Sequence, residues 1–325
     1  MNKLKVGYCY NNIIDFPRVD SQPLDIDAEW TSPQDIETLK VGLESAGFEV
    51  IDIGNPQNLI KEIVRTKVDI VFSIAEMTGF RYRESVASML CELYNIPYVL
   101  SPPDVLLVAL DKHITNLLLH NKGINIPIWH ILKSISDFDK IIFDKVDYIL
   151  KPVAEGSSIG ISKDSIVSTK DVAIKRAEYL LKAYKQPVLL QEYIYAKEVT
   201  IGVIEVDNRI KALTPVIVNN SGLSDAEYKK KSKESEPIFF LENENLIKKV
   251  QTLAEFIFEE IGCKDTARID FKIDDEENIY FIELNPLTDY TPRKDFCKSA
   301  FASGFSYDSL LKTIILNAWK RSHKL

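Results

Sequence analysis

Cysteine and histidine are scarce in this chain, and their spacing excludes several kinds of site. The 325 residues contain four cysteines, no two of which form a Cys-x-x-Cys pair, and four histidines that are not spaced like metal ligands. Neither a disulfide framework nor a zinc site is indicated. Reduced thiols suit a cytoplasmic protein, which is our expectation. Nothing local to Cys297 indicates a lowered thiol pKa, so we expect an inert cysteine there.

Long apolar runs and an excess of positive charge are also missing. No stretch approaches the length of a membrane span, and the formal net charge of -8 does not favour a nucleic-acid partner. Hydrophobic residues make up 46% of the chain and charged residues 27%, which is an ordinary globular balance. We therefore expect a globular protein of about two or three domains that binds neither membrane nor nucleic acid.

Strand-like and helix-like segments alternate over the first hundred residues. Ser32-Pro33 predicts the start of a helix that stops at Gly47. Strands are expected at 6–10, 48–53, 69–74 and 96–99. This alternation is typical of a parallel, doubly wound α/β domain, which we place at residues 1–102.

The rest of the chain indicates two further units. A helix that carries Leu110 and Ile114 is expected to end near Gly123, and a small α/β unit is expected over 103–187. The segment 188–325 has a more antiparallel pattern, so the predicted class is α/β with α+β character in the C-terminal part. The polar stretch 219–237 is too long for a simple connection and indicates a lid.

Two short strands in the C-terminal unit carry candidate metal ligands. Side chains alternate along a strand, so Arg268 and Asp270 share one face, as do Glu283 and Asn285. A hairpin across the acidic turn 274–278 would place Asp270 roughly opposite Glu283. Two carboxylates and an amide oxygen suit Mg²⁺. A solvated acidic hairpin explains the pattern equally well.

A Gly/Ser-rich turn, residues 154–160, follows the strand that contains Lys151. Its glycines permit close backbone approach, and its amides and hydroxyls can donate to a phosphate, although an ordinary turn is the alternative. The turn also fits Gly-x-Ser-x-Gly with Ser158 as a nucleophile. That elbow needs a helix directly after it, whereas residues 161–164 continue as a strand or turn, which argues against a serine hydrolase.

Taken in order, four elements of the chain resemble the ATP-grasp superfamily, and in particular its D-alanine–D-alanine ligase branch. The similarity spans roughly residues 68 to 319. The elements are Leu110-Asp111-Lys112 with Tyr148-Ile149-Leu150-Lys151-Pro152 and its Gly/Ser turn, Gln191-Glu192-Tyr193-Ile194 with Lys197-Glu198-Val199, Asp225-Ala226-Glu227-Tyr228-Lys229, and Arg268-Ile269-Asp270 with Glu283-Leu284-Asn285.

The resemblance implies an ATP-grasp fold and an ATP-dependent carboxylate–amine ligase that releases ADP and forms an amide or peptide bond through an acyl phosphate. It implies ATP and Mg²⁺ as cofactors, with two ions expected and Mn²⁺ as a substitute, small amino acid or peptide substrates, and a homodimer. The implied catalytic residues are Arg268, Lys229 and Ser158. The implied nucleotide-binding residues are Lys112, Lys151, Ser157, Ser158, Glu192, Glu198 and Lys229, and the implied metal ligands are Asp270, Glu283 and Asn285.

The chain departs from that family's pattern at the substrate end. Tyr8 to Asn12 stand in place of a Gly-Gly-x-Ser-x-Glu stretch, Thr288-Asp289 replaces Pro-Gly, and Lys294 occupies the position of a carboxylate-binding serine. We therefore expect a substrate other than two D-alanines. The candidate carboxylate-binding residues are Arg81, Arg83, Arg293 and Lys294, each of which is also explained as a surface cation. The alternative function is a catalytically silent ATP-binding scaffold or regulatory protein of the same fold.

Overall fold

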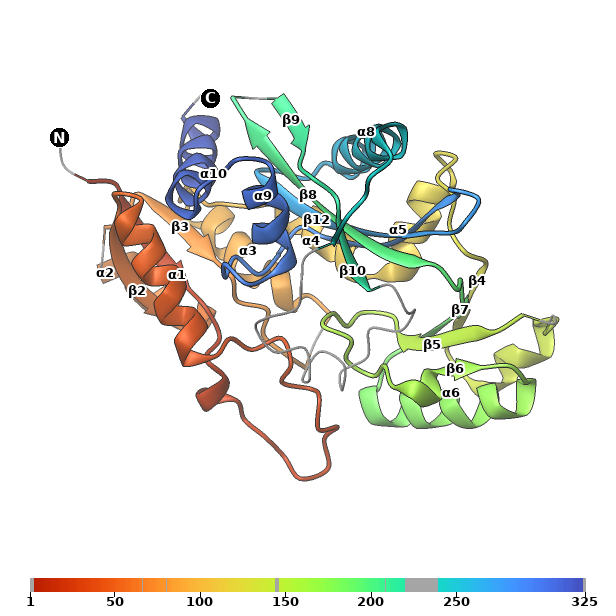
Figure 1. The fold of residues 1–325 in the computed structure, drawn as a ribbon. Coiled ribbons are helices and arrows are strands. Elements are labelled where there is room, and N and C mark those ends of the chain that lie inside the picture. The colour runs from red at the N-terminus through yellow and green to blue at the C-terminus, as the bar shows by residue number, and fades with distance from the viewer. Residues whose placement is uncertain are drawn as a thin grey trace.

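The computed structural model describes residues 3–65, 67–79, 81–143, 146–207, 209–219 and 239–323. Within these ranges the strands form three sheets, with the N-terminal sheet at the left of Figure 1 and the sheet that contains β5 and β6 at the lower right.

The N-terminal sheet is parallel, in the order β2-β1-β3. Its elements are β1 (Lys5–Cys9), η1 (Ile13–Asp15), α1 (Pro33–Ser45), β2 (Glu49–Gly54), α2 (Pro56–Arg65), β3 (Ile70–Ser73), η2 (Arg83–Ser85) and α3 (Val86–Leu93). The predicted start of α1 is confirmed, because the Ser32 side chain accepts a hydrogen bond of 3.2 Å from the Asp35 amide and Pro33 is the first helical residue.

Helices cover both faces of this sheet, as a doubly wound domain requires. Tyr8 and Phe72 pack with Leu39 of α1 on one face. Cys9 and Val71, the neighbours of those two residues, pack with residues of α2 and α3 on the other face. The prediction of a parallel α/β unit at the start of the chain is confirmed.

The C-terminal helix α10 (Tyr307–Ser322) also packs on the N-terminal sheet, beside α1. The two helices approach so closely that a side chain at Gly42 would collide with Tyr307. The chain thus returns to its first unit, and this contact joins the two ends of the sequence in one core.

Two predicted elements differ in the structure. Residues 96–99 form a single parallel bridge between Val71 and Tyr98 instead of a strand. The helix expected to run through Leu110 to Gly123 is two helices, α4 (Pro103–Leu110) and α5 (Lys112–His120). Asp111 breaks it, because its backbone is extended while its carboxylate caps the first amides of α5.

The central sheet is antiparallel, in the order β4-β7-β5-β6. Its elements are β4 (Trp129–Leu132), η3 (Ile135–Lys140), β5 (Tyr148–Pro152), η4 (Lys163–Ser165), β6 (Ile166–Val167), α6 (Lys170–Tyr184) and β7 (Val188–Glu192). The boundary that we expected after residue 187 falls just before β7. It would separate β7 from β4 and β5, with which β7 pairs in the central sheet. The division into three units remains a prediction.

The third sheet carries the predicted hairpin. Its elements are β8 (Lys197–Val206), β9 (Arg209–Ala212), β10 (Val216–Asn219), β11 (Phe239–Phe240), α8 (Glu244–Ile261), β12 (Thr266–Ile273), β13 (Ile279–Asn285) and α9 (Asp295–Ala302). β12 and β13 are antiparallel, and Asp270 pairs directly with Glu283, which confirms the predicted register. The helix α8 covers one face of this sheet with an apolar core, so the polar side chains of β12 and β13 occupy the other face.

Candidate active site

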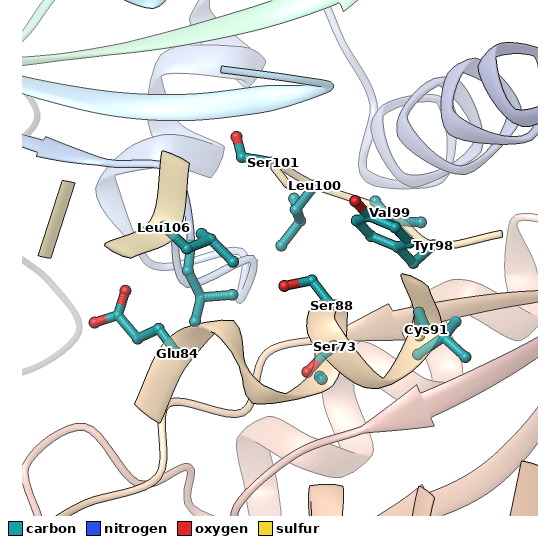
Figure 2. Close-up of a pocket in the computed structure, with 12 residues that line it drawn as sticks. Ser73, Glu84, Ser88, Cys91, Tyr98, Val99, Leu100, Ser101 and Leu106 are labelled. Carbon is teal, nitrogen blue, oxygen red and sulfur yellow. The ribbon is translucent and has the colours of Figure 1, made fainter. Parts of the chain in front are cut away.

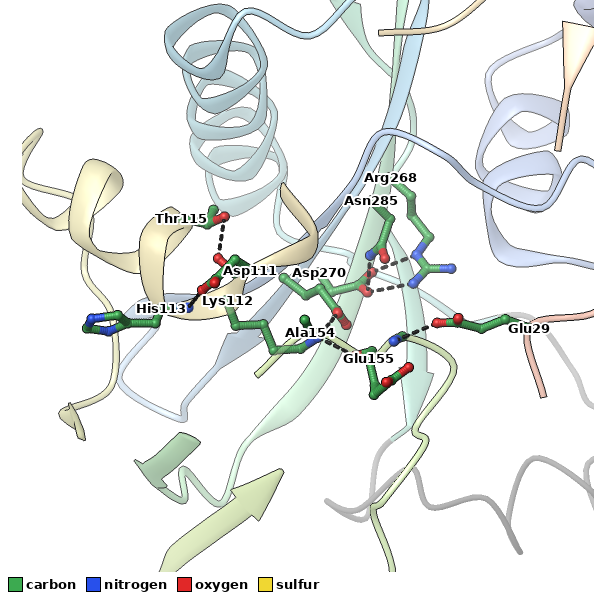
Figure 3. Close-up of polar contacts among 12 residues, drawn as sticks. Glu29, Asp111, Lys112, His113, Thr115, Ala154, Glu155, Arg268, Asp270 and Asn285 are labelled. Atoms are coloured by element: carbon green, nitrogen blue, oxygen red, sulfur yellow. Dashed lines mark hydrogen bonds and ion pairs between the residues drawn. The ribbon is translucent and has the colours of Figure 1, made fainter. Parts of the chain in front are cut away.

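Asp270 lies in a polar group built by three neighbouring strands (Figure 3). Arg268 contacts both of its oxygens, with donor–acceptor distances of 3.1 Å from Nε and 2.9 Å from a terminal nitrogen. Asn285 donates its amide to Asp270 at 3.3 Å, and the Thr200 hydroxyl also donates to it. These contacts hold the carboxylate in one orientation, and the donated Asn285 amide leaves the carbonyl oxygen of that side chain as an acceptor.

Glu283 is the second carboxylate of the group and is held ionised by lysines. Its carboxylate lies 2.7 Å from Lys112 Nζ. Burial acts to raise the Glu283 pKa, but the charges of Lys112 and Lys151 outweigh it and lower the pKa to about 2. Lys112 also donates to the Glu155 carbonyl oxygen, so α5 is joined to both the hairpin and the Gly/Ser turn.

Lys151, on β5 of the central sheet, extends the group across to a second sheet. It is 5% exposed, and burial together with the charge of Lys112 lowers its pKa to about 8. The negative charges of Glu283 and Glu198 raise the pKa of Lys151, but by less than burial and Lys112 lower it. The structure thus brings lysines, carboxylates and an arginine from α5, β5, β8, β12 and β13 to one region.

The predicted metal ligands fit a hard divalent cation. Asp270, Glu283 and Asn285 would supply two carboxylates and an amide oxygen, the donor set that Mg²⁺ takes up alongside phosphate oxygens and water. The low pKa of Glu283 keeps that ligand in the anionic form. In the structure Lys112 and Arg268 neutralise these carboxylates, and a bound cation would share that task.

The Gly/Ser turn adopts an unusual backbone. Ser157 and Ser158 both have positive φ, 48° and 62°, which is uncommon for residues other than glycine and often marks a functional segment. The segment after the turn is η4, a 3₁₀ helix of three residues, so the context of a serine-hydrolase elbow is missing at Ser158.

Comparisons with known proteins agree with this geometry. The sequence model of the family described as D-ala D-ala ligase C-terminus matches residues 118–316. A D-alanine–D-alanine ligase from Aquifex aeolicus is 30% identical over 275 residues, which cover 84% of this chain and 90% of that protein. The chain belongs to the D-alanine–D-alanine ligase family. It is accordingly an ATP-dependent carboxylate–amine ligase that uses a divalent metal ion.

Solved ligase structures share the fold over nearly the whole chain. The D-alanine–D-alanine ligase from Bacillus anthracis complexed with ATP aligns with a TM-score of 0.74 and 20% identity, covering 99% of each chain. A D-Ala:D-Ser ligase from Enterococcus faecalis aligns with a TM-score of 0.75 and 18% identity, covering 98% of this chain and all of that one (100%). These likenesses establish the ATP-grasp fold. No helix within the described ranges has the length and apolar character needed to cross a membrane.

The remaining nucleotide candidates of this ligase lie toward the other end of the site. Glu192 ends β7, and its amide donates to the Ile128 carbonyl at 2.8 Å. Glu198 lies on β8, on the same face as Thr200. Lys229 is outside the described residues, so its role as a γ-phosphate ligand remains a prediction.

Arg83, a predicted substrate ligand, is buried in a carboxylate-rich setting. It is 3% exposed, and one terminal nitrogen donates to the Ala154 carbonyl at 2.7 Å. Its other terminal nitrogen lies 2.8 Å from Glu29 and 3.1 Å from Glu155. The guanidinium therefore connects the Gly/Ser turn to the N-terminal unit. We had predicted that it binds a substrate carboxylate, but in the structure it binds the carboxylates of the protein itself.

The other three substrate candidates are more exposed and each has a carboxylate partner. Arg81 pairs with Asp111, Arg293 lies 2.6 Å from Asp35, and Lys294 lies 3.3 Å from Asp289. A substrate carboxylate would have to share or displace these partners. Arg293 thus contacts the first turn of α1, Lys294 contacts a residue five positions earlier in the chain, and Arg81 contacts the residue that caps α5.

Two acidic residues of the N-terminal unit reach the Gly/Ser turn, and sequence reasoning missed both. Glu29 accepts a hydrogen bond of 2.6 Å from the Gly156 amide, and Asp25 accepts one of 2.8 Å from the Gly160 amide. In the structure these two carboxylates therefore accept hydrogen bonds from amides that the turn would donate to a phosphate. No periodicity or motif marks them, because they lie in an irregular loop more than a hundred residues away. Thr200, in contrast, could have been found from strand alternation with Glu198.

A second carboxylate group adjoins the site. Oxygens of Glu29, Glu76 and Glu84 all lie within 4.8 Å of one another. Burial raises the pKa of Glu84 to about 8, and the nearby charge of Arg83 only partly offsets this. Figure 2 shows Glu84 at the edge of a small cavity of ≈ 10 Å³ lined also by Ser88 and Leu106. That cavity has room for about one water molecule, so it is not a nucleotide site.

Proposed function

We propose that this ligase joins the carboxylate of one small amino acid or peptide to the amine of another, and that at least one of the two differs from D-alanine. The convergence of Lys112, Lys151, Arg268, Asp270 and Glu283 supports the ATP-dependent half of the proposal. The departures at Thr288-Asp289 and Lys294 support the change of substrate. The named relatives include D-alanine–D-alanine ligases and a D-Ala:D-Ser ligase, so one of the paired amino acids differs among proteins of this fold.

The proposed chemistry proceeds in two steps. The γ-phosphoryl group moves from ATP to the donor carboxylate, which is otherwise a poor acyl donor because its leaving group would be oxide. The acceptor amine then attacks the acyl carbon, the C–N bond forms, and inorganic phosphate leaves. A bound Mg²⁺ would neutralise phosphate charge at Asp270, Glu283 and Asn285.

The residues of this chain have separate tasks in that scheme. Lys112 and Lys151 would bind phosphate oxygens, since both are cations that already face Glu283. Arg268, which Asp270 holds in a fixed orientation, would stabilise the anionic tetrahedral intermediate. The Gly/Ser turn with Ser157 and Ser158, and Lys229 of the 219–237 segment, would cover the phosphates and exclude water.

A screen of ADP release tests this proposal. Purified protein with Mg·ATP is offered pairs of amino acids and dipeptides, including D-alanine with itself and D-alanine with D-serine. We expect ADP and phosphate to appear only with the correct carboxylate and amine. Full turnover with D-alanine alone would contradict the change of substrate, and ATP binding without turnover in any pair would favour the silent scaffold.

Three further properties complete the proposal. We propose two Mg²⁺ ions, which Mn²⁺ can replace, because the family resemblance implies them; metal titration of ADP release measures this. We also propose a homodimer, to be measured by light scattering in solution. A cytoplasmic location fits four buried, free cysteines, and fractionation of the source cells would test it.

A further inference from the structure

The Gly/Ser turn uses its backbone amides in two ways. The amides of Ile159 and Ile161 donate to carbonyl oxygens of the turn itself, at 2.9 and 3.0 Å. The amides of Gly156 and Gly160 donate instead to two carboxylates of the N-terminal unit, at 2.6 and 2.8 Å. An anion that binds to these two amides must therefore replace a carboxylate at each of them.

Glu29 is packed tightly against the turn. Its Oε1 accepts the hydrogen bond from the Gly156 amide, and a Cβ atom at residue 156 would lie 2.5 Å from that oxygen, so glycine is what lets the carboxylate come this close. Its Oε2 accepts a hydrogen bond of 2.8 Å from Arg83. Loss of the contact with Gly156 would leave Glu29 with its arginine partner.

Asp25 is held at the other end of the turn by a similar pair of contacts. One carboxylate oxygen accepts from the Gly160 amide, and the other accepts from the Tyr184 hydroxyl of α6 at 2.8 Å. The side chain is also partly exposed, so water can solvate it. Both carboxylates can therefore leave the turn without being stranded in the protein interior.

Phosphate and carboxylate oxygens make the same kind of contact with a backbone amide. Both are anionic acceptors, and a hydrogen bond to either is charge-assisted, which makes it about twice as strong as a bond between neutral groups. Like charges at contact distance also repel each other. A phosphate group and these carboxylates therefore exclude each other from the amides of Gly156 and Gly160. A neutral acceptor would tie the turn to the N-terminal unit equally well without this competition.

We infer that Asp25 and Glu29 form an autoinhibitory latch, which competes with the phosphates of ATP for the amides of Gly156 and Gly160 and releases the turn when the phosphates bind. The inference rests on the proposed function, which places the phosphates beneath the Gly/Ser turn. Because linked equilibria are reciprocal, a latch that ATP opens weakens the binding of ATP by the same factor. Removal of the latch strengthens ATP binding, whereas removal of a residue that only supports the turn weakens it.

Calorimetric titration with Mg·ATP tests the inference. The variant is Asp25→Ala, because Glu29 also neutralises buried Arg83 and its loss would disturb the fold. Asp27→Ala is the matched control, since Asp27 belongs to the same loop but pairs with Arg18. A hydrogen bond to a charged group is worth enough to change an affinity about tenfold. We expect Asp25→Ala to bind ATP about five to ten times more tightly than wild type, and Asp27→Ala to stay within about twofold of it.

Hydrogen exchange in the wild-type protein is a second test that needs no variant. The amides of Ala28 and Trp30 donate within the same loop, at 3.0 and 2.9 Å. We expect both to exchange severalfold faster when Mg·ATP is bound, because the loop then loses its two contacts with the turn. Unchanged or slower exchange would overturn the inference.

The titration also separates the inference from the proposed function. An Asp25→Ala protein that binds ATP as wild type does, or more weakly, means that the carboxylate only supports the turn, which overturns the inference. Equal strengthening in Asp25→Ala and Asp27→Ala is a general effect of net charge and overturns it too. Wild type that binds no ATP overturns the proposed function itself.

Discussion

Asp270 and Glu283 face each other across the β12–β13 pair, and each is matched by its own cation, Arg268 for Asp270 and Lys112 for Glu283. The cations come from different elements, since Arg268 is on the same strand as Asp270 whereas Lys112 begins α5. The lysines beside Glu283 lower its pKa to about 2, so this carboxylate is ionised before any nucleotide arrives. A change to Glu283 therefore leaves buried Lys112 without its partner, and a change to Asp270 does the same to half-buried Arg268.

Loss of either carboxylate should abolish turnover while the protein stays folded. We expect Asp270→Asn and Glu283→Gln each to lower kcat for ADP release by about a hundredfold or more, because each removes a carboxylate that we propose as a metal ligand. Asp275→Asn, at an exposed position in the turn of the same hairpin, is the matched control and should retain wild-type activity. Circular dichroism checks the fold, and wild-type activity in a folded Glu283→Gln protein would contradict the metal assignment.

Arg83 should matter far more for stability than Arg81. Replacing buried Arg83 by methionine leaves Glu29 and Glu155 without their shared partner, and removing one member of a buried ion-pair network costs about 3–5 kcal/mol. Arg81→Met removes an ion pair whose arginine is 52% exposed, for which we expect a loss of less than about 1 kcal/mol. Urea denaturation measures the free energy of unfolding of both variants. A loss in Arg83→Met as small as that expected for Arg81→Met would contradict a stabilising role of the Arg83 network.

Asp265 should make stability depend on pH in the acid range. This carboxylate lies 2.7 Å from Arg321 and accepts a hydrogen bond of 2.7 Å from the Leu100 amide. Burial nevertheless raises its pKa to about 6, with Arg321 acting in the opposite direction. The folded protein therefore binds the proton more tightly than the unfolded chain, so the protonated form stabilises the fold below pH 4 and this contribution is lost as the pH rises through about 6.

Unfolding of Asp265→Asn and wild type across pH 4 to 7 measures this dependence. Because the folded pKa lies about two units above the unfolded one, wild type should lose about 2–3 kcal/mol over this range relative to the variant. Parallel curves for the two proteins would contradict the raised pKa of Asp265. This test does not depend on enzyme activity, because the side chain of Asp265 contacts Leu100, Asn317 and Arg321, none of which is a candidate site residue.

Gly160 should be irreplaceable in the Gly/Ser turn. Its φ is 76°, and a Cβ atom would lie 2.6 Å from the ring of Pro152. Gly304 is the matched control, since its φ is also positive, 91°, and a Cβ there would meet no described heavy atom within 4 Å. We expect Gly304→Ala to lose about 1 kcal/mol from backbone strain alone, and Gly160→Ala to lose more and to bind ATP more weakly. Similar losses and unchanged ATP affinity in both variants would contradict the close packing of the turn.

Local patterns predicted much of the fold correctly. The start of α1 at Ser32-Pro33, the parallel N-terminal sheet and the pairing of Asp270 with Glu283 all follow from neighbouring residues and from strand alternation. The prediction of one helix through Leu110 to Gly123 was wrong, because apolar spacing does not reveal that Asp111 leaves the helical conformation and caps the next helix. The strand expected at 96–99 was also wrong, because the segment meets β3 only at Val71 and the pairing stops after one bridge.

The grouping of Arg268, Asp270, Glu283 and Asn285 followed from the amino-acid sequence, because these residues lie close together in the chain and hairpin geometry follows from local alternation. What surrounds them became visible only in the folded protein. Glu29 reaches Gly156 across 127 positions, and Lys272 meets Ile194 across 78. Such contacts depend on how separate sheets pack, which no local pattern encodes. For the same reason Arg83, a substrate candidate from its sequence, lies in the structure as a buried cation among carboxylates.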